Sequence, residues 1–229
     1  MTTEREKVGL AALHRRLHSV LPNVSLTCQT LPNTPAIRLW LLDELFPEQA
    51  LDPRIVNAIM EEPPYWSFCW ASGQVLAEFL LSNPQWVQGR CVVDVGPGSG
   101  VVAIAAAKAG AARVIACDLD PWALAATELN AAENGVSIEL SQDLDAALAD
   151  AHLVTAADIL YDRENLPLLA RFRRAETVLL ADSRVPDLDP AGYRLLGQWQ
   201  SCTWPDLGES SEYNGVRLFA SEPSAPGNV

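Results

Sequence analysis

Basic side chains and long apolar runs are scarce in this sequence of 229 residues. It has 16 lysines and arginines against 29 aspartates and glutamates, so the formal net charge at pH 7 is −13. Such a surface repels phosphate backbones, which argues against nucleic acid as a partner. The longest uncharged apolar stretch, Val101 to Ala107, is far shorter than the roughly 20 residues of a membrane-spanning helix. The charged first residues precede no apolar signal core, and we expect a cytoplasmic protein with no membrane association.

Metal-binding patterns are also missing. The five cysteines include no C-x-x-C pair, so neither a zinc spacing nor a disulfide framework is indicated. Cys91 and Cys117 lie inside apolar runs and are expected to fill the core. His14 and His18 share one helix face, but no carboxylate or third histidine accompanies them. We therefore expect no metal site, and we expect these histidines on a solvated helix face.

The composition, 49% apolar and 20% charged, is that of an ordinary globular domain. From about residue 90 onward, short β-branched runs alternate with helical segments. Repeated strand–helix–strand units predict a parallel sheet covered on both faces. The expected strands are 90–95, 113–117, 138–140, 153–156 and 177–180. The expected helices are 72–81, 101–108, 121–134, one around Asp145 and 166–173.

The two ends of the chain follow other patterns. Residues 4–21 predict a helix, 37–42 a strand and 53–60 a short helix. Near the C-terminus, 193–199 and 215–220 read as two strands without a helix between them, which indicates an antiparallel edge pair. The predicted class is α/β: a Rossmann-like, seven-stranded, mostly parallel sheet with helices on both faces, antiparallel C-terminal edge strands and an N-terminal helical and β extension.

A glycine-rich turn follows the first strand of the repeated region. Asp94 lies near the end of that strand, and Gly96, Gly98 and Gly100 follow before a helix begins. Glycine lets the backbone approach a ligand, and the helix N-terminus offers free amides. Asp118 ends the second strand, 18 residues after the last of these glycines. An acid at that place can accept both hydroxyls of a ribose.

Two cofactor classes fit the turn. A dinucleotide site usually has G-x-G-x-x-G spacing and binds a pyrophosphate. Here the spacing is G-x-G-x-G, and Asp94 disfavours a phosphate but suits an ammonium group. This favours S-adenosylmethionine, with S-adenosylhomocysteine as product, over a nicotinamide cofactor; a tight turn without a ligand is the third reading. After the third strand, Asp143 is placed either to accept from an adenine amine or to cap a helix.

The fourth strand is followed by Asp158 and Tyr161. Ligands of open α/β sheets bind beyond the carboxyl ends of the strands, so both residues should face the crevice of Asp94 and Asp118. Asp158 is suited to orient a substrate ammonium group, and Tyr161 to pack against its alkyl stem. Because a negative charge raises the pKa of a neighbouring amine, Asp158 should position the amine more than acidify it. Capping of the next helix is the alternative for Asp158.

Together these motifs resemble the seven-strand protein lysine methyltransferases, and among them the enzymes acting on the β subunit of electron-transfer flavoprotein. The resemblance extends from about residue 34 to residue 219. It departs at 182–186, where the family tends to have a second glycine-containing turn. Asp158-Ile-Leu-Tyr161 matches the D/E-x-x-Y/F motif of this family. The residues that carry the resemblance are 34–42, Pro64-Tyr65-Trp66, Trp70, Gly73, Gln74, 94–100, 117–121 and 158–162.

The resemblance implies S-adenosylmethionine-dependent N-methylation of lysine in a protein substrate. It adds Trp70 to a donor pocket of Asp94, the glycine turn, Asp118 and Asp143, with core packing as the alternative for Trp70. The expected boundaries are 1–64 for the extension, 65–222 for the methyltransferase domain and 223–229 for a flexible tail, and a monomer is favoured. Methylation of a small nicotinamide-like amine, or a non-catalytic nucleoside-binding scaffold, are the alternatives.

Overall fold

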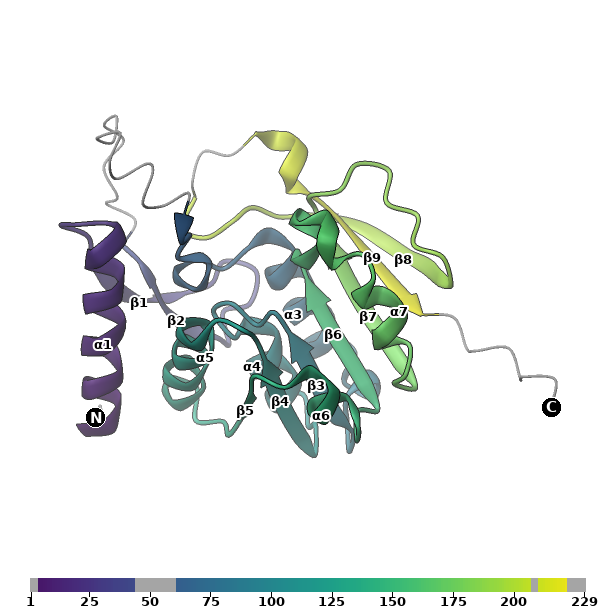
Figure 1. The fold of residues 1–229 in the computed structure, drawn as a ribbon, viewed down its shortest axis with the longest axis horizontal. Coiled ribbons are helices and arrows are strands. Elements are labelled where there is room, and N and C mark those ends of the chain that lie inside the picture. The colour runs from purple at the N-terminus through teal and green to yellow at the C-terminus, as the bar shows by residue number, and fades with distance from the viewer. Residues whose placement is uncertain (1–3, 44–60, 207–209, 222–229) are drawn as a thin grey trace.

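The computed structural model describes residues 4–43, 61–206 and 210–221. The predicted helix at 53–60 and the predicted tail lie outside these residues. A seven-stranded sheet forms the centre of the molecule (Figure 1), in the order β5-β4-β3-β6-β7-β9-β8. The predicted α/β class and the seven strands are confirmed.

The first five strands of this sheet are parallel, as the strand–helix alternation predicts. All residues of β3 are buried, as expected of a strand covered on both faces. The strands are β3 (Cys91–Val95), β4 (Arg113–Cys117), β5 (Glu139–Ser141), β6 (Leu153–Ala157), β7 (Thr177–Asp182), β8 (Tyr193–Gln200) and β9 (Gly215–Ser221).

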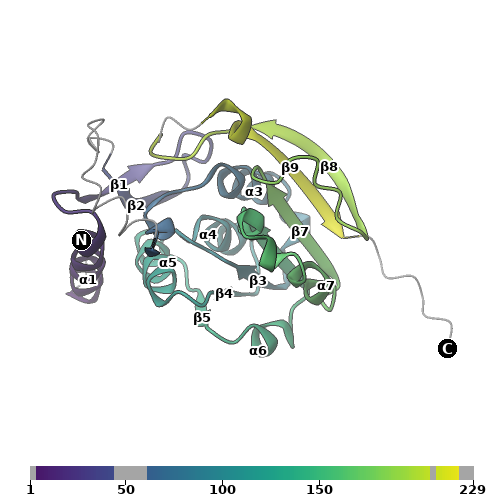
Figure 2. The same ribbon diagram turned by 45° about the horizontal axis from the view of Figure 1, so that its top comes forward.

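Helices cover both faces of the sheet (Figure 2). One apolar cluster joins α3, α4 and α5 to the sheet, and a second joins α6 and α7 to the other face. Cys91 and Cys117 are buried free thiols in the second cluster, as expected. The helices are α3 (Ala71–Ser82), α4 (Val101–Lys108), α5 (Pro121–Glu133), α6 (Leu144–Leu148) and α7 (Leu168–Phe172).

The two C-terminal strands are antiparallel, but only β8 lies at the edge of the sheet. β9 pairs with β8 on one side and with β7 on the other, where Asp182 faces Arg217. Three consecutive residues of β9 (Leu218, Phe219 and Ala220) are buried, which suits an interior strand rather than an edge. The predicted antiparallel pair is therefore confirmed, with β9 inside the sheet.

The N-terminal extension packs against α5. Helix α1 (Glu4–Val20) and the hairpin of β1 (Leu26–Thr30) and β2 (Arg38–Leu42) form it. Leu13 and Leu17 bury their side chains in an apolar cluster with residues of α5, and the backbone N–H of Trp40 donates to Asn130 at 2.7 Å. Strand β1 was not predicted, since Leu-Thr-Cys-Gln-Thr has no clear apolar alternation.

The two histidines of α1 hold the chain that follows the helix. Nε2 of His14 accepts the backbone N–H of Leu26 at 2.8 Å, and Nε2 of His18 bonds the carbonyl of Val24 at 2.5 Å. The predicted solvated face holds for His18, which is exposed, whereas His14 is partly buried, and both rings bond the chain at the start of β1. Within the described residues, no group of three or more metal-ligating side chains occurs and no helix is long and apolar enough to cross a membrane.

Candidate active site

A cavity of about 1130 Å³ lies at the carboxyl ends of the parallel strands. Strands β3, β4 and β6 meet there: a glycine-rich turn follows β3, and turns with acidic side chains follow β4 and β6. Of the predicted site residues, the cavity lining contains Trp70, Gly96, Gly98, Asp118, Asp143, Asp158 and Tyr161. Asp94 and Gly100 lie outside this lining.

The glycine turn after β3 has the conformation that only glycine adopts readily. Gly96 has φ +67°, and a Cβ there would lie 2.8 Å from a methyl group of Ile159. Gly98 has φ +53°, and a Cβ there would meet no atom within 4 Å. Gly98 thus leaves open space at the cavity wall, which is the geometry of a backbone cradle for a ligand.

Gly100 serves the packing of two helices. It has φ +85° at the N-cap of α4, and a Cβ there would lie 3.0 Å from the backbone of Thr127 in α5. Position 100 must therefore be glycine for α4 and α5 to pack this closely. Contact between Gly100 and a bound donor stays a prediction.

Asp94 is buried beneath the glycine turn. Its Oδ1 accepts the hydroxyl of Thr155 at 2.8 Å, and its Oδ2 accepts the backbone N–H of Ala103 at 3.1 Å. Burial raises the pKa of this carboxyl to about 7, against the lowering effect of both hydrogen bonds. Asp94 lines a small pocket of about 30 Å³ beside the main cavity, together with Gly96 and Gly98.

Asp118 stands at the end of β4 in the cavity wall. Its Oδ1 accepts the backbone N–H of Asp120 at 2.9 Å, and burial raises the pKa of its carboxyl. The next residue, Leu119, is 84% exposed although apolar, and it also lines the cavity. Leu119 was not predicted as a site residue, although an apolar residue directly after a strand-ending acid is a signal that could have identified it.

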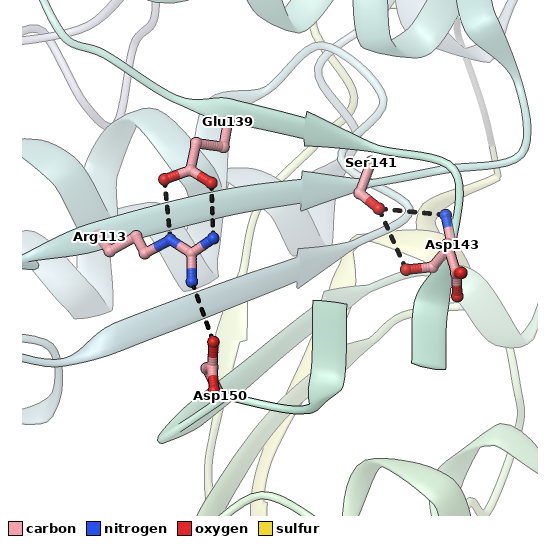
Figure 3. Close-up of polar contacts among 5 residues, drawn as sticks. All are labelled: Arg113, Glu139, Ser141, Asp143 and Asp150. Atoms are coloured by element: carbon pink, nitrogen blue, oxygen red, sulfur yellow. Dashed lines mark hydrogen bonds and ion pairs between the residues drawn. The ribbon is translucent and has the colours of Figure 1, made fainter. Parts of the chain in front are cut away.

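Asp143 begins helix α6 at the other side of this wall. Figure 3 shows the Ser141 hydroxyl bonded to the backbone N–H and carbonyl of Asp143. Its Oδ1 accepts the N–H of Ala146 at 3.0 Å, so the capping alternative is confirmed; an adenine contact stays a prediction. The same view shows a bidentate pair between Arg113 and Glu139, which joins β4 to the three-residue strand β5.

Asp158 joins three segments at the base of the cavity. It has φ +52° and is buried. Its Oδ1 accepts the hydroxyl of Ser72 at 2.7 Å and both the N–H and hydroxyl of Ser183, at 2.8 and 2.9 Å. From the described residues, its Oδ2 accepts the N–H of Ser72 alone, at 3.2 Å. Asp158 thus caps the first turn of α3 rather than the helix that follows it.

Ser72 and Ser183 were not identified from the sequence, because each bonds Asp158 across a long chain separation. Ser183 reaches it because Asp182 holds the loop after β7: Oδ1 of Asp182 accepts the N–H groups of Arg184 and Val185, at 3.1 and 2.8 Å. This loop is where the sequence departs from the family it resembles. It places the guanidinium of Arg184 5.1 Å from the ring centre of Trp70.

Two nearby tryptophans have different environments. Trp66 is buried in the cluster shared by α1 and α5. Trp70 is half-buried, and its indole lies against the cavity. The core alternative therefore describes Trp66 better than Trp70.

Methyltransferases are among the similar proteins found by family model, by sequence and by structure. The sequence model of the ribosomal protein L11 methyltransferases (PrmA) matches residues 79–163. The chain is 36% identical over 146 residues to the electron transfer flavoprotein beta subunit lysine methyltransferase of Xenopus laevis, covering 62% of this chain and 58% of the relative. The mouse protein of that name is 38% identical over 104 residues, covering 44% and 41%.

A ribosomal protein L11 methyltransferase of Aeromonas hydrophila is 39% identical over 179 residues, covering 71% of this chain and 56% of the relative. The chain thus matches about half the length of these curated relatives. Among solved structures, a Pyrococcus horikoshii protein provisionally described as an RNA methyltransferase has a TM-score of 0.52 at 16% identity, covering 67% of this chain and 84% of that one. This likeness supports the fold. The chain folds as a Rossmann-like methyltransferase domain, and its resemblance to the seven-strand protein lysine methyltransferases is confirmed.

Proposed function

We propose that this protein is an S-adenosylmethionine-dependent methyltransferase that methylates lysine side chains of a protein. The electron-transfer flavoprotein β subunit, named in several relatives, is the first candidate substrate. The observation that carries the proposal is the cavity, where the glycine turn, Asp118 and the Asp158–Tyr161 pair face one space.

The cavity fits the methyl donor on two observations. The open space at Gly98 leaves room for a ligand against the backbone. Asp118 lines the cavity at the strand end where a ribose binds in such folds. We assign Asp118 to the ribose hydroxyls, Asp143 and Leu119 to the adenine, and Asp94, Trp70 and the glycine turn to the methionine portion.

The bound donor would supply a methyl group on a sulfonium, which a neutral amine attacks in line. The protein contributes position and exclusion of water. A lysine ammonium, with a pKa of about 10.4 in water, must first lose its proton to solvent. Oδ2 of Asp158 accepts one hydrogen bond within the protein, which leaves it able to accept another from the substrate amine. Tyr161 packs beside the lysine stem.

The test is transfer of label from methyl-labelled S-adenosylmethionine to purified acceptors. Electron-transfer flavoprotein β subunit and ribosomal protein L11 serve as separate acceptors, followed by peptide mapping of the labelled residue. Label on lysine supports the proposal. Label only on a small amine from a lysate would support the alternative of small-molecule methylation, and donor binding without transfer would support a scaffold.

Asp118→Ala should weaken donor binding by roughly tenfold or more. Hydrogen bonds to a charged group contribute about 1.5–3 kcal/mol each, and the ribose would lose them. Titration calorimetry with S-adenosylhomocysteine measures the change, and NAD serves as the comparison ligand, for which we expect much weaker binding to the wild type. Asp120→Ala is the control, because it removes the neighbouring helix cap without removing Asp118. An unchanged dissociation constant in a folded Asp118→Ala protein would assign Asp118 to its turn alone.

A further inference from the structure

Two exposed tyrosines from distant parts of the chain meet at the cavity. Tyr65 opens a short 3₁₀ turn after the N-terminal extension, and Tyr161 ends the turn after β6. Their ring centres are 5.1 Å apart with an interplanar angle of 50°. They remain 40% and 57% exposed, and both line the cavity. Large aromatic rings that stay exposed at a cavity are available to a ligand.

Tyr65 is held in place by its neighbours. Its ring lies 5.7 Å from that of Trp70 at 66°, an edge-to-face arrangement. The indole N–H of Trp70 donates to the carbonyl of Tyr65 at 3.0 Å, and the N–H of Tyr65 donates to the carbonyl of Pro63 at 2.8 Å. Tyr65 therefore joins the Trp70 side of the cavity to Tyr161 through fixed contacts.

The surroundings of the tyrosine pair favour a cation. The cavity lining contains more acidic than basic side chains: six aspartates (118, 120, 143, 145, 158 and 162) against Arg171 and Arg184. Burial raises the pKa of Tyr161, and so do the negative charges of Asp118 and Asp162. The adjoining ring of Trp70 already carries a cation, since the Arg184 guanidinium lies over it. Among the described residues that line the cavity, Arg184 makes a cation–π contact with Trp70. Tyr65 and Tyr161 make no such contact with these residues, so their rings are available to a ligand.

We propose that Tyr65 is a specificity-determining residue, whose ring forms with Tyr161 a binding surface for the alkylammonium end of the substrate lysine. This rests on the proposed function and adds a residue to it. A positive group over a tyrosine face is attracted by the negative face of the ring, more strongly where water is excluded, while the methylene stem of lysine gains apolar contact with the same rings. The arrangement selects a long, flexible cationic side chain.

The first test uses n-butylammonium as a probe of the lysine end, with n-butanol as its neutral counterpart. Binding to the protein saturated with S-adenosylhomocysteine is followed by NMR titration. Tyr65→Leu removes the aromatic face and keeps apolar bulk, whereas Tyr65→Phe keeps the face. We expect Tyr65→Leu to weaken n-butylammonium binding three- to thirtyfold, Tyr65→Phe to bind like wild type, and n-butanol to bind weakly to all three. Equal ammonium binding by all three proteins, or equal loss in both variants, overturns the inference.

The second test is acceptor methylation by the same proteins. We expect Tyr65→Leu to lower kcat/KM for the protein acceptor about tenfold, with the S-adenosylhomocysteine dissociation constant within twofold of wild type. Leu195→Ala, which shortens a side chain 50% exposed on β8, is the control for loss of surface apolar area. Tyr65-dependent binding of n-butylammonium without methylation of either protein acceptor would sustain this inference and contradict the proposed function.

Discussion

Asp158→Asn should lower turnover about a hundredfold while donor affinity stays within a few-fold of wild type. The substitution removes the charge that would orient an ammonium group, and positioned groups of this kind contribute about 10²–10⁴ in rate. In the wild type, the N–H of Ser72 donates to Oδ2 of Asp158. In the variant an amide NH₂ group takes the place of Oδ2, so two donors face each other. A moderate loss of stability, about 1–3 kcal/mol, should therefore accompany the loss of turnover.

Two further variants separate these effects. Ser72→Ala removes one hydrogen bond to Asp158 but keeps its charge, so it should lose stability with little loss of turnover. Asp150→Asn makes the same charge change outside the cavity lining, at a side chain that is 76% exposed and pairs with Arg113. Turnover and donor affinity of each variant are measured together with denaturant unfolding. If Asp158→Asn is folded and turns over normally, Asp158 serves only to join its three segments.

The fold could be predicted from the sequence because local and global preferences agree in the core. Val101–Lys108 and Arg113–Cys117 form the predicted helix and strand with the predicted bounds. The misses are β1 and the inner position of β9. Strand β1 has weak alternation and is fixed by pairing with β2. The place of β9 depends on contacts with β7, about 35 residues earlier in the chain, which no local pattern encodes.

The candidate site could be predicted only as far as the strand ends. Because parallel strands bring their carboxyl ends together, Asp118 and Asp158 were found by position alone. The partners of Asp158 could not be found this way, since Ser72 and Ser183 reach it from a helix start and another strand end. The same limit applies to Tyr65, which meets Tyr161 from 96 positions earlier in the chain.

The stability of the wild type relative to Asp94→Asn should fall as pH rises from 5 to 8. The folded-state pKa of Asp94 is raised to about 7, whereas an unfolded aspartate has a pKa of about 3.9. Between these values the folded state binds more protons than the unfolded state, so the free energy of unfolding decreases with rising pH. At about 1.4 kcal/mol per pH unit, the expected relative loss is about 2–3 kcal/mol, nearly complete above pH 7. Asparagine at 94 can still accept from Ala103 and can donate to Thr155, so the variant should fold.

Urea unfolding of both proteins at several pH values measures this change. The difference in their free energies of unfolding cancels the contributions of other titrating groups. Among these are Asp182, whose pKa is raised to about 6, and His14, whose pKa is lowered. A difference independent of pH would mean that Asp94 is ionised throughout the range.

The proposed contact between Asp94 and the donor also predicts a pH dependence of donor binding. An ammonium group near Asp94 favours the ionised carboxylate, so donor binding to the wild type should release a proton and tighten as pH rises through 7. In Asp94→Asn this pH dependence should disappear, and donor affinity should be weaker at pH 8. Calorimetry in buffers of different ionisation enthalpy measures the proton release directly, and equal release by both proteins would remove Asp94 from the donor site.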